Sequence, residues 1–107
     1  MINIADIKMK PSNFGGNNEP EQLFGLAAQL TSKGIQHGVW QSGPGELTLN
    51  FEWNETIYIL EGSAEVKNLM TEEKFTLIAG SMMTFEQGSH WRWRIPWKLK
   101  KIFTILE

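Results

Sequence analysis

The stretch from Glu55 to Gly62 constrains the fold more than any other part of the chain. It reads Glu-Thr-Ile-Tyr-Ile-Leu-Glu-Gly, and its inner positions 56–60 carry no charge. Runs of this length that are rich in β-branched and aromatic residues are typical of strands. Because polar residues do not alternate with the apolar ones, we expect both faces of this strand to be covered. One face then lines the interior of a barrel, and the other contacts a second sheet or another subunit.

Further short strands, separated by turns that contain glycine or polar residues, are predicted after residue 34. Residues 46–53 alternate strictly between polar and apolar side chains, which indicates a half-buried strand. The other predicted strands are residues 35–41, 55–67, 74–78, 82–85, 90–95 and 98–106. Many short strands with little helix are typical of a sandwich or a barrel, and a barrel removes the exposed edges of a small sheet. The sequence therefore predicts an all-β barrel.

Residues 1–34 are predicted to form an N-terminal arm, and residues 35–107 the barrel. Within the arm, the segment from Pro20 to Lys33 has leucines at helical spacing, a proline suited to a first turn, and Gly34 as a terminator. Gly25 weakens a helix by about 1 kcal/mol relative to alanine. The sequence leaves a short helix and an extended arm as equal alternatives.

Composition and charge exclude several classes of function. The chain has 107 residues, of which 41% are hydrophobic, and this suits one soluble domain. Its net charge of −2 argues against a nucleic-acid partner or an anionic membrane surface. No apolar run is long enough to cross a bilayer, no signal-peptide pattern is present, and cysteine is absent. We expect a cytoplasmic protein without thiol chemistry.

Two segments with regularly spaced glycines resemble the two motifs of the cupin family, which are small jelly-roll barrels. In the first segment, Gly43 is followed by Leu49 and Phe51, then by Glu55 and finally by Gly62. The spacing is that of the family's glycine, two histidines, glutamate and second glycine. The two histidine positions are therefore apolar in this chain.

The second motif is represented by Gly80 and Gly88, with Trp91 at the family's histidine position and Ile95 at its asparagine position. A narrower resemblance, to small cupins related to ureidoglycine aminohydrolase and an ethanolamine-utilisation protein, lies in residues 54–62, 84–88, 91–93 and 100–103. The likeness covers residues 35–106. It implies a cupin-type double-stranded β-helix far more firmly than it implies a reaction.

The departures from the family affect the expected metal site. A cupin takes its metal-binding histidines from positions that hold Leu49, Phe51 and Trp91 here, so only Glu55 remains. One carboxylate cannot provide the three or four protein ligands that a catalytic metal requires. We therefore expect no metal and no cofactor, with His37 as the only unusual route to a further ligand.

The expected binding residues are Leu49, Phe51, Glu55, Trp91 and Trp93. Strand parity directs these side chains into the barrel and directs His90 outward. No cationic partner for Glu55 is evident from the sequence, so this carboxyl is expected alone among rings. Such a group can act as a general acid or base, or can bind an amine. Aromatic faces add a cation–π attraction of about 0.5–2 kcal/mol.

Three functions remain open at this point. The first is metal-free binding of a small amine-like or sugar-like molecule around Glu55. The second is a metal-independent isomerase, lyase or amine hydrolase that uses Glu55 as its acid or base. The third is a structural or regulatory subunit whose barrel is filled by tryptophans.

Apolar side chains outside the expected pocket suggest a protein partner. Tyr58 and Leu60 lie on the face of their strand opposite to the core, and an exposed apolar patch favours association. The resemblance to cupins also implies dimers, so we expect a homodimer, with an N-terminal arm folded over its own barrel as the alternative. Trp53 and Trp97 lie beside turns and are expected at the rim or at an interface, whereas Trp40 is expected in the core.

Overall fold

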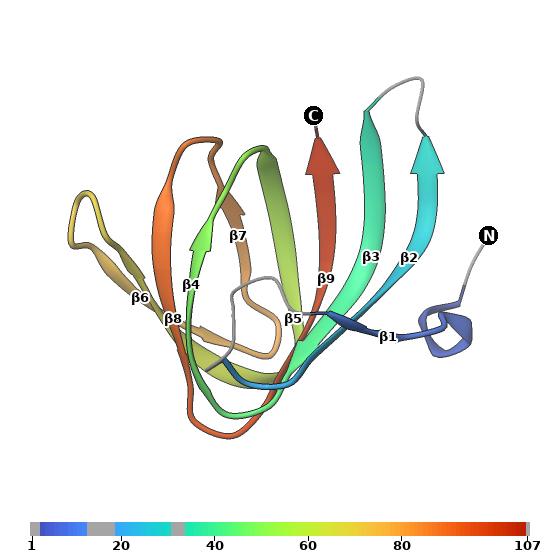
Figure 1. The fold of residues 1–107 in the computed structure, drawn as a ribbon, viewed down its shortest axis with the longest axis horizontal. Helices are drawn as coiled ribbons and strands as arrows, with labels where there is room; N and C mark the ends of the chain where they lie inside the picture. Colours follow the sequence, from blue (N-terminus) through green and yellow to red (C-terminus); the bar gives the residue numbers. More distant parts are fainter. Residues whose placement is uncertain (1–2, 13–18, 31–33, 107) are drawn as a thin grey trace.

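The computed structural model describes residues 3–12, 19–30 and 34–106, without the side chains of residues 27–30. It consists almost entirely of antiparallel strands that curl into a jelly-roll half-barrel (Figure 1). The elements are η1 (Ile4–Asp6), β1 (Lys10–Ser12), β2 (Gln22–Leu30), β3 (Ile35–Ser42), β4 (Gly45–Asn50), β5 (Asn54–Asn68), β6 (Lys74–Ile78), β7 (Met82–Phe85), β8 (His90–Ile95) and β9 (Leu99–Leu106). In these ranges η1, a single 3₁₀ turn, is the only helix, and no candidate membrane-spanning helix is found.

Strand β5 organises the sheet, as the apolar run at its start predicts. The strand order is β1-β2-β3-β9-β5-β8-β4, and β6 and β7 also pair with β5. The first half of β5 pairs with β7 and β9, whereas its second half pairs with β6 and β8. The two halves are separated by a register shift between Ile59 and Glu61. One strand thereby belongs to both sides of the curled sheet.

Gly62 permits this change of partners. It follows the register shift, and its φ of 81° lies in the left-handed region that favours glycine. A Cβ atom at this position would collide with the carbonyl oxygen of Lys98. The glycine that ends the apolar run is therefore required by the close approach of two backbones.

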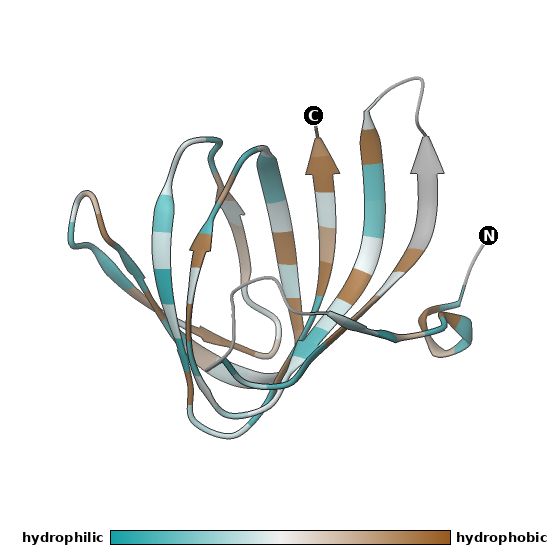
Figure 2. Cartoon of the chain, viewed as in Figure 1, coloured by the Kyte–Doolittle hydropathy of each residue, from teal (hydrophilic) through white to brown (hydrophobic). Residues whose placement is uncertain are grey.

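The core lies on the concave side of the curled sheet. Along the first half of β5 and along β9, buried side chains alternate with more exposed ones, and Figure 2 shows brown bands in these strands separated by white or teal ones. The largest fully buried side chains include Trp93, Phe85, Ile57 and Ile59. The alternation predicted for residues 46–53 is seen in β4 and the turn after it, where Leu47 and Phe51 are buried.

The helical alternative for residues 20–33 is wrong. Residues Gln22–Leu30 form strand β2, which pairs with β1 and β3, and residues 31–33 lie outside the described part. Leucine spacing fits a helix, but the backbone of β2 instead completes hydrogen bonds along the edge of β3. Gly25, which weakens a helix, suits this strand because an added Cβ would lie 2.6 Å from the Lys8 carbonyl oxygen. The extended alternative describes this part of the arm.

Candidate functional site

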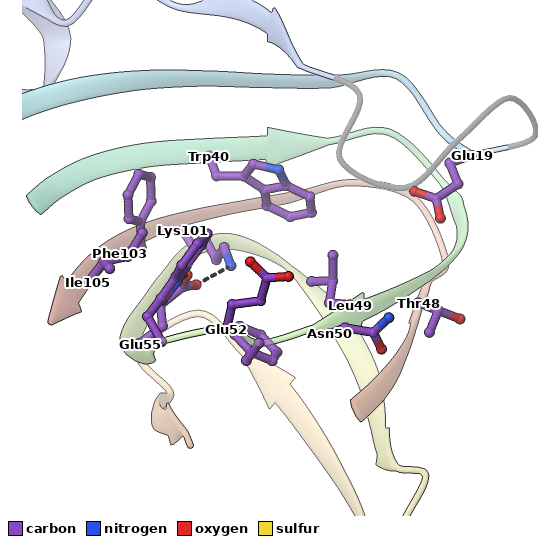
Figure 3. Close-up of a pocket in the computed structure, with 12 residues that line it drawn as sticks. Glu19, Trp40, Thr48, Leu49, Asn50, Glu52, Glu55, Lys101, Phe103 and Ile105 are labelled. Atoms are coloured by element: carbon purple, nitrogen blue, oxygen red, sulfur yellow. Dashed lines mark hydrogen bonds and ion pairs between the residues drawn. The ribbon is translucent and has the colours of Figure 1, made fainter. Parts of the chain in front are cut away.

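The concave face of the sheet holds an open cavity of about 450 Å³ (Figure 3). Its size is within the usual range for sites that bind small molecules. The lining residues are Glu19, Trp40, Thr48, Leu49, Asn50, Phe51, Glu52, Trp53, Glu55, Lys101, Phe103 and Ile105. They come from β3, β4, β5, β9, the β4–β5 connection and the segment that precedes β2.

Glu55 is not alone in this cavity. The Lys101 ammonium donates a hydrogen bond of 2.9 Å to Glu55 Oε2, and the two side chains are only 4% and 8% exposed. Lys101 is paired with Ile59 in the β5–β9 register, and its long side chain reaches back along the strand to Glu55. The expectation of a carboxyl without a cationic partner is therefore wrong. A buried ion pair of this kind requires further compensation for its lost hydration.

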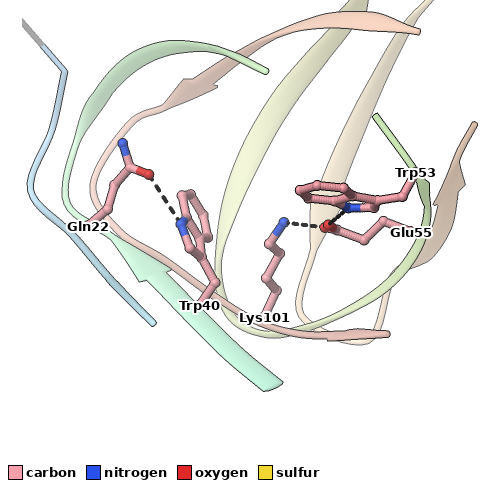
Figure 4. A network of polar contacts seen from close by, with 5 residues as sticks. All are labelled: Gln22, Trp40, Trp53, Glu55 and Lys101. Carbon is pink, nitrogen blue, oxygen red and sulfur yellow. Dashed lines mark hydrogen bonds and ion pairs between the residues drawn. The ribbon is translucent and has the colours of Figure 1, made fainter. Parts of the chain in front are cut away.

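Aromatic rings supply part of that compensation. The ammonium of Lys101 lies 4.8 Å from the ring centroid of Trp40 and 4.7 Å from that of Trp93. These two rings contact each other edge to face, with centroids 6.1 Å apart. Trp53 Nε1 donates a hydrogen bond of 3.2 Å to Glu55 Oε1 (Figure 4). The negative ring faces and the carboxylate all favour a positive charge at this point.

The N-terminal arm contributes to the same network. Trp40 Nε1 donates a 3.2 Å hydrogen bond to Gln22 Oε1, and Gln22 Nε2 donates a 3.1 Å hydrogen bond to Glu19 Oε2. The side chain of Gln22 is buried. It lies at one end of the network, on β2 (Figure 4). The orientation of the Trp40 ring thus depends on β2, which the resemblance to cupins does not cover.

The predicted binding residues fall into two groups. Leu49, Phe51 and Glu55 line the cavity, whereas Trp91 and Trp93 are buried but do not line it. Trp93 contacts Lys101 from the core side, and Trp91 packs edge to face on Phe85. Among the described residues, the Nε1 atoms of Trp91 and Trp93 lack a hydrogen-bond partner. Both rings therefore belong to the packed layer beneath the cavity.

Two other tryptophans form the aromatic part of the lining. Trp40 is buried in the core cluster, as predicted, and it also borders the cavity. Trp53 is half-buried and borders the cavity. Trp97 lies outside the cavity and is mostly exposed.

The sequence family is decided by a match to the EutQ-like cupin domain, which covers residues 30–103. The chain is a EutQ-like cupin. A search of curated proteins finds no significant match. The family assignment agrees with the antiparallel jelly-roll architecture.

Solved structures support the same fold for this cupin. The EutQ protein of Clostridium difficile matches with a TM-score of 0.83 at 14% identity, over 99% of this chain and 85% of that protein. A Vibrio parahaemolyticus protein of unknown function matches with a TM-score of 0.71 at 19% identity, over 92% of this chain and 97% of that protein. A cupin superfamily protein of Desulfitobacterium hafniense matches with a TM-score of 0.68 at 14% identity, over 85% of this chain and 82% of that protein. At these identities the likeness establishes the fold alone.

The residues of this cupin do not fit a metal ion. Leu49, Phe51 and Trp91 carry no metal-binding atoms, and Glu55 already accepts hydrogen bonds on both oxygens. Within the described ranges, no group of three or more His, Cys, Asp or Glu side chains is placed to hold one.

The two histidines of this cupin do not change that conclusion. His37 Nδ1 lies 3.0 Å from Thr104 Oγ1, and this hydroxyl belongs to the outer face of β9. His90 is exposed, as predicted, and its Nδ1 lies 2.7 Å from Asn50 Oδ1. Neither imidazole is directed toward Glu55.

The sequence interpretation missed the central residue of the site. Lys101 is one of several basic residues near the end of the chain, and a lysine is normally expected on the exposed face of a strand. A signal was present, because Leu99 and Phe103 lie two positions away on either side and share its face. The parity of that strand places a lysine in the core.

Proposed function

We propose that this EutQ-like cupin binds a small amine in the cavity without a metal ion. The observation that carries this proposal is the balance of charge around the cavity. Of its four charged residues, Glu55 and Lys101 neutralise each other in the buried pair. The carboxylates of Glu19 and Glu52 remain, so the lining favours a positively charged ligand.

Glu52 is best placed to meet such a ligand. It belongs to the connection between β4 and β5, and its carboxylate is directed over the cavity beside Leu49 (Figure 3). Among the described residues, Glu52 has no side-chain hydrogen-bond or ion-pair partner, whereas Glu19 accepts a bond from Gln22. An exposed ion pair contributes about 0.2–1 kcal/mol, so Glu52 provides selectivity more than affinity.

The remaining lining favours a ligand with a short hydrocarbon portion. Leu49, Phe51, Phe103 and Ile105 form an apolar wall around the cavity. Burial of apolar surface contributes about 25 cal/mol per Å², so this wall can supply most of the binding free energy. The ligand class that matches both features is an alkylammonium ion.

The alternatives have weaker support. Both oxygens of Glu55 accept hydrogen bonds, from Lys101 and Trp53, so the carboxylate is engaged with two protein donors rather than presented to a substrate. This disfavours an enzyme with Glu55 as its acid or base. The open cavity beside Glu55 disfavours a barrel plugged by tryptophans. A sugar-like ligand would use the same aromatic lining but would not depend on Glu52.

Titration calorimetry against butylammonium, 1-butanol, butyrate and glucose tests the proposal. We expect butylammonium to bind more tightly than its neutral and anionic analogues. Glu52→Gln should weaken its binding by about 1.5- to 5-fold, which corresponds to one exposed ion pair. Glu86→Gln is the matched control, because Glu86 is exposed and does not border the cavity. Equal binding of butanol, or preferred binding of glucose, would contradict the amine assignment.

We also propose that the cupin forms a homodimer through the outer face of β5, β7 and β9. Tyr58 pairs in register with Met82 on one side and Ile102 on the other. Tyr58, Met82 and Leu106 are 39%, 69% and 50% exposed. These side chains are uncharged, so two copies of the face can meet without repulsion between like charges.

A further inference from the structure

We infer that Lys101 is an internal cation that takes over the place of the metal ion in this cupin. The family's metal-ligand positions retain one acid, Glu55, and the structure gives that acid an ammonium as its partner. The inference does not depend on the identity of the ligand that enters the cavity.

The surroundings of the ammonium are those of a cation-binding cage. Glu55 Oε2 accepts its hydrogen bond at 2.9 Å, and ring centroids of Trp40 and Trp93 lie 4.8 and 4.7 Å from Nζ. A carboxylate combined with aromatic faces is the arrangement by which proteins recognise alkylammonium ligands. In this cupin the alkylammonium is the chain's own side chain.

The walls of the cage are themselves held in place. Trp53 donates a hydrogen bond to the second oxygen of Glu55, and Gln22 accepts the indole N–H of Trp40. The cage residues come from strands β3, β5, β8 and β9, so the cation joins both sides of the curled sheet. Fixed partners reduce the cost of holding a charge away from water.

This arrangement has a direct consequence for metals. A divalent cation would have to displace the Lys101 ammonium and would find a single carboxylate in return, because Leu49, Phe51 and Trp91 offer no ligand atoms. The alternative role for Lys101 is simple packing, in which the four-carbon stem fills space and the charge is incidental. The two roles differ in whether an uncharged molecule of the same size can replace the lysine side chain and restore the Tm.

Chemical rescue of Lys101→Ala distinguishes the role of internal cation from simple packing. The atoms removed by this substitution correspond to propylammonium, and 1-propanol is the neutral molecule of the same size. We expect the variant to lose at least about 10 °C in Tm, because Glu55 is left buried without its partner. Propylammonium at ten times its Kd should restore about 5 °C. Propanol at the same concentration should restore little.

Two controls define the effect. Lys100→Ala removes a neighbouring lysine whose strand parity places it on the outer face, and its Tm should stay close to that of the wild type. Wild-type protein treated with propylammonium shows how much stabilisation comes from binding in the open cavity. Only an increase in the Tm of Lys101→Ala that exceeds the increase seen in the wild type supports the inference. A negative amine titration of the wild type would therefore contradict the proposed function and leave this inference standing.

A second pair of variants applies if Lys101→Ala does not fold. Lys101→Met keeps the length of the stem and removes the charge, and we expect a lower Tm. Adding Glu55→Gln should recover most of the loss, because the buried acid is then neutral as well. The inference is overturned if Lys101→Met is as stable as the wild type or if propanol rescues Lys101→Ala as well as propylammonium. Stoichiometric Mn²⁺, Zn²⁺ or Ni²⁺ binding that is lost in Glu55→Gln would also overturn it.

Discussion

Replacement of Gln22 by leucine should destabilise the protein through Trp40, although Gln22 lies outside the barrel predicted from the sequence. Leucine has nearly the same volume, so the change creates no large cavity. The indole N–H of Trp40, which is buried and 3.2 Å from Gln22 Oε1, loses its acceptor. An unsatisfied buried donor costs about 1–3 kcal/mol.

Two smaller effects partly offset each other. The hydrogen bond from Gln22 Nε2 to Glu19 is also lost, whereas the leucine side chain gains from apolar burial in the same place. If the lost hydrogen bond and the gained apolar burial are equal in size, the free energy of unfolding should fall by about 1–3 kcal/mol, and Tm by about 4–13 °C. Thermal unfolding followed by tryptophan fluorescence measures the change.

Gln41→Leu is the matched control for this experiment. Gln41 is half-buried on β3, and no side-chain hydrogen bond is assigned to it among the described residues. The same chemical change there should alter Tm by no more than about 2 °C. If both variants unfold at the same temperature, the contact between Gln22 and Trp40 does not contribute to stability, and the role given to the arm is wrong.

Three further predictions concern single positions. Gly62→Ala should cost at least about 1–3 kcal/mol and more than Gly80→Ala in chemical denaturation, because Gly80 also has a positive φ but no atom near its added Cβ. Trp53→Phe removes the hydrogen bond to Glu55 and should lower the free energy of unfolding by about 1 kcal/mol; an unchanged free energy of unfolding would contradict that bond. Tyr58→Lys should convert the proposed dimer to a monomer, and light scattering measures the mass of both proteins. A monomeric wild type would refute the proposed interface.

Much of the fold could be predicted from the sequence because burial in a curled sheet follows strand parity. The apolar run after Glu55 became the central strand, and the alternation around Leu47 became β4. Leucine spacing near Gly25 was ambiguous because it fits a helix and also an edge strand. That choice depended on the free edge of β3, which no local pattern reveals.

The site was less predictable because it depends on contacts between distant strands. Parity correctly directed Trp91 and Trp93 inward, but it cannot distinguish a cavity wall from the layer beneath it. None of the described lining residues comes from β8, and this depends on how the strands are arranged in space rather than on parity. Lys101 shows the opposite problem, since parity alone pointed to the core while its charge pointed to the surface.

The position of β9 between β3 and β5 has a consequence for folding on the ribosome. Both of its neighbours precede it in the chain, so a nascent chain exposes the facing edges of these two strands until β9 emerges. Long-range pairing of this kind is slow, and unpaired edges can associate with other chains. Strand β9 also carries Lys101, so Glu55 gains its ammonium partner only after β9 has been synthesised.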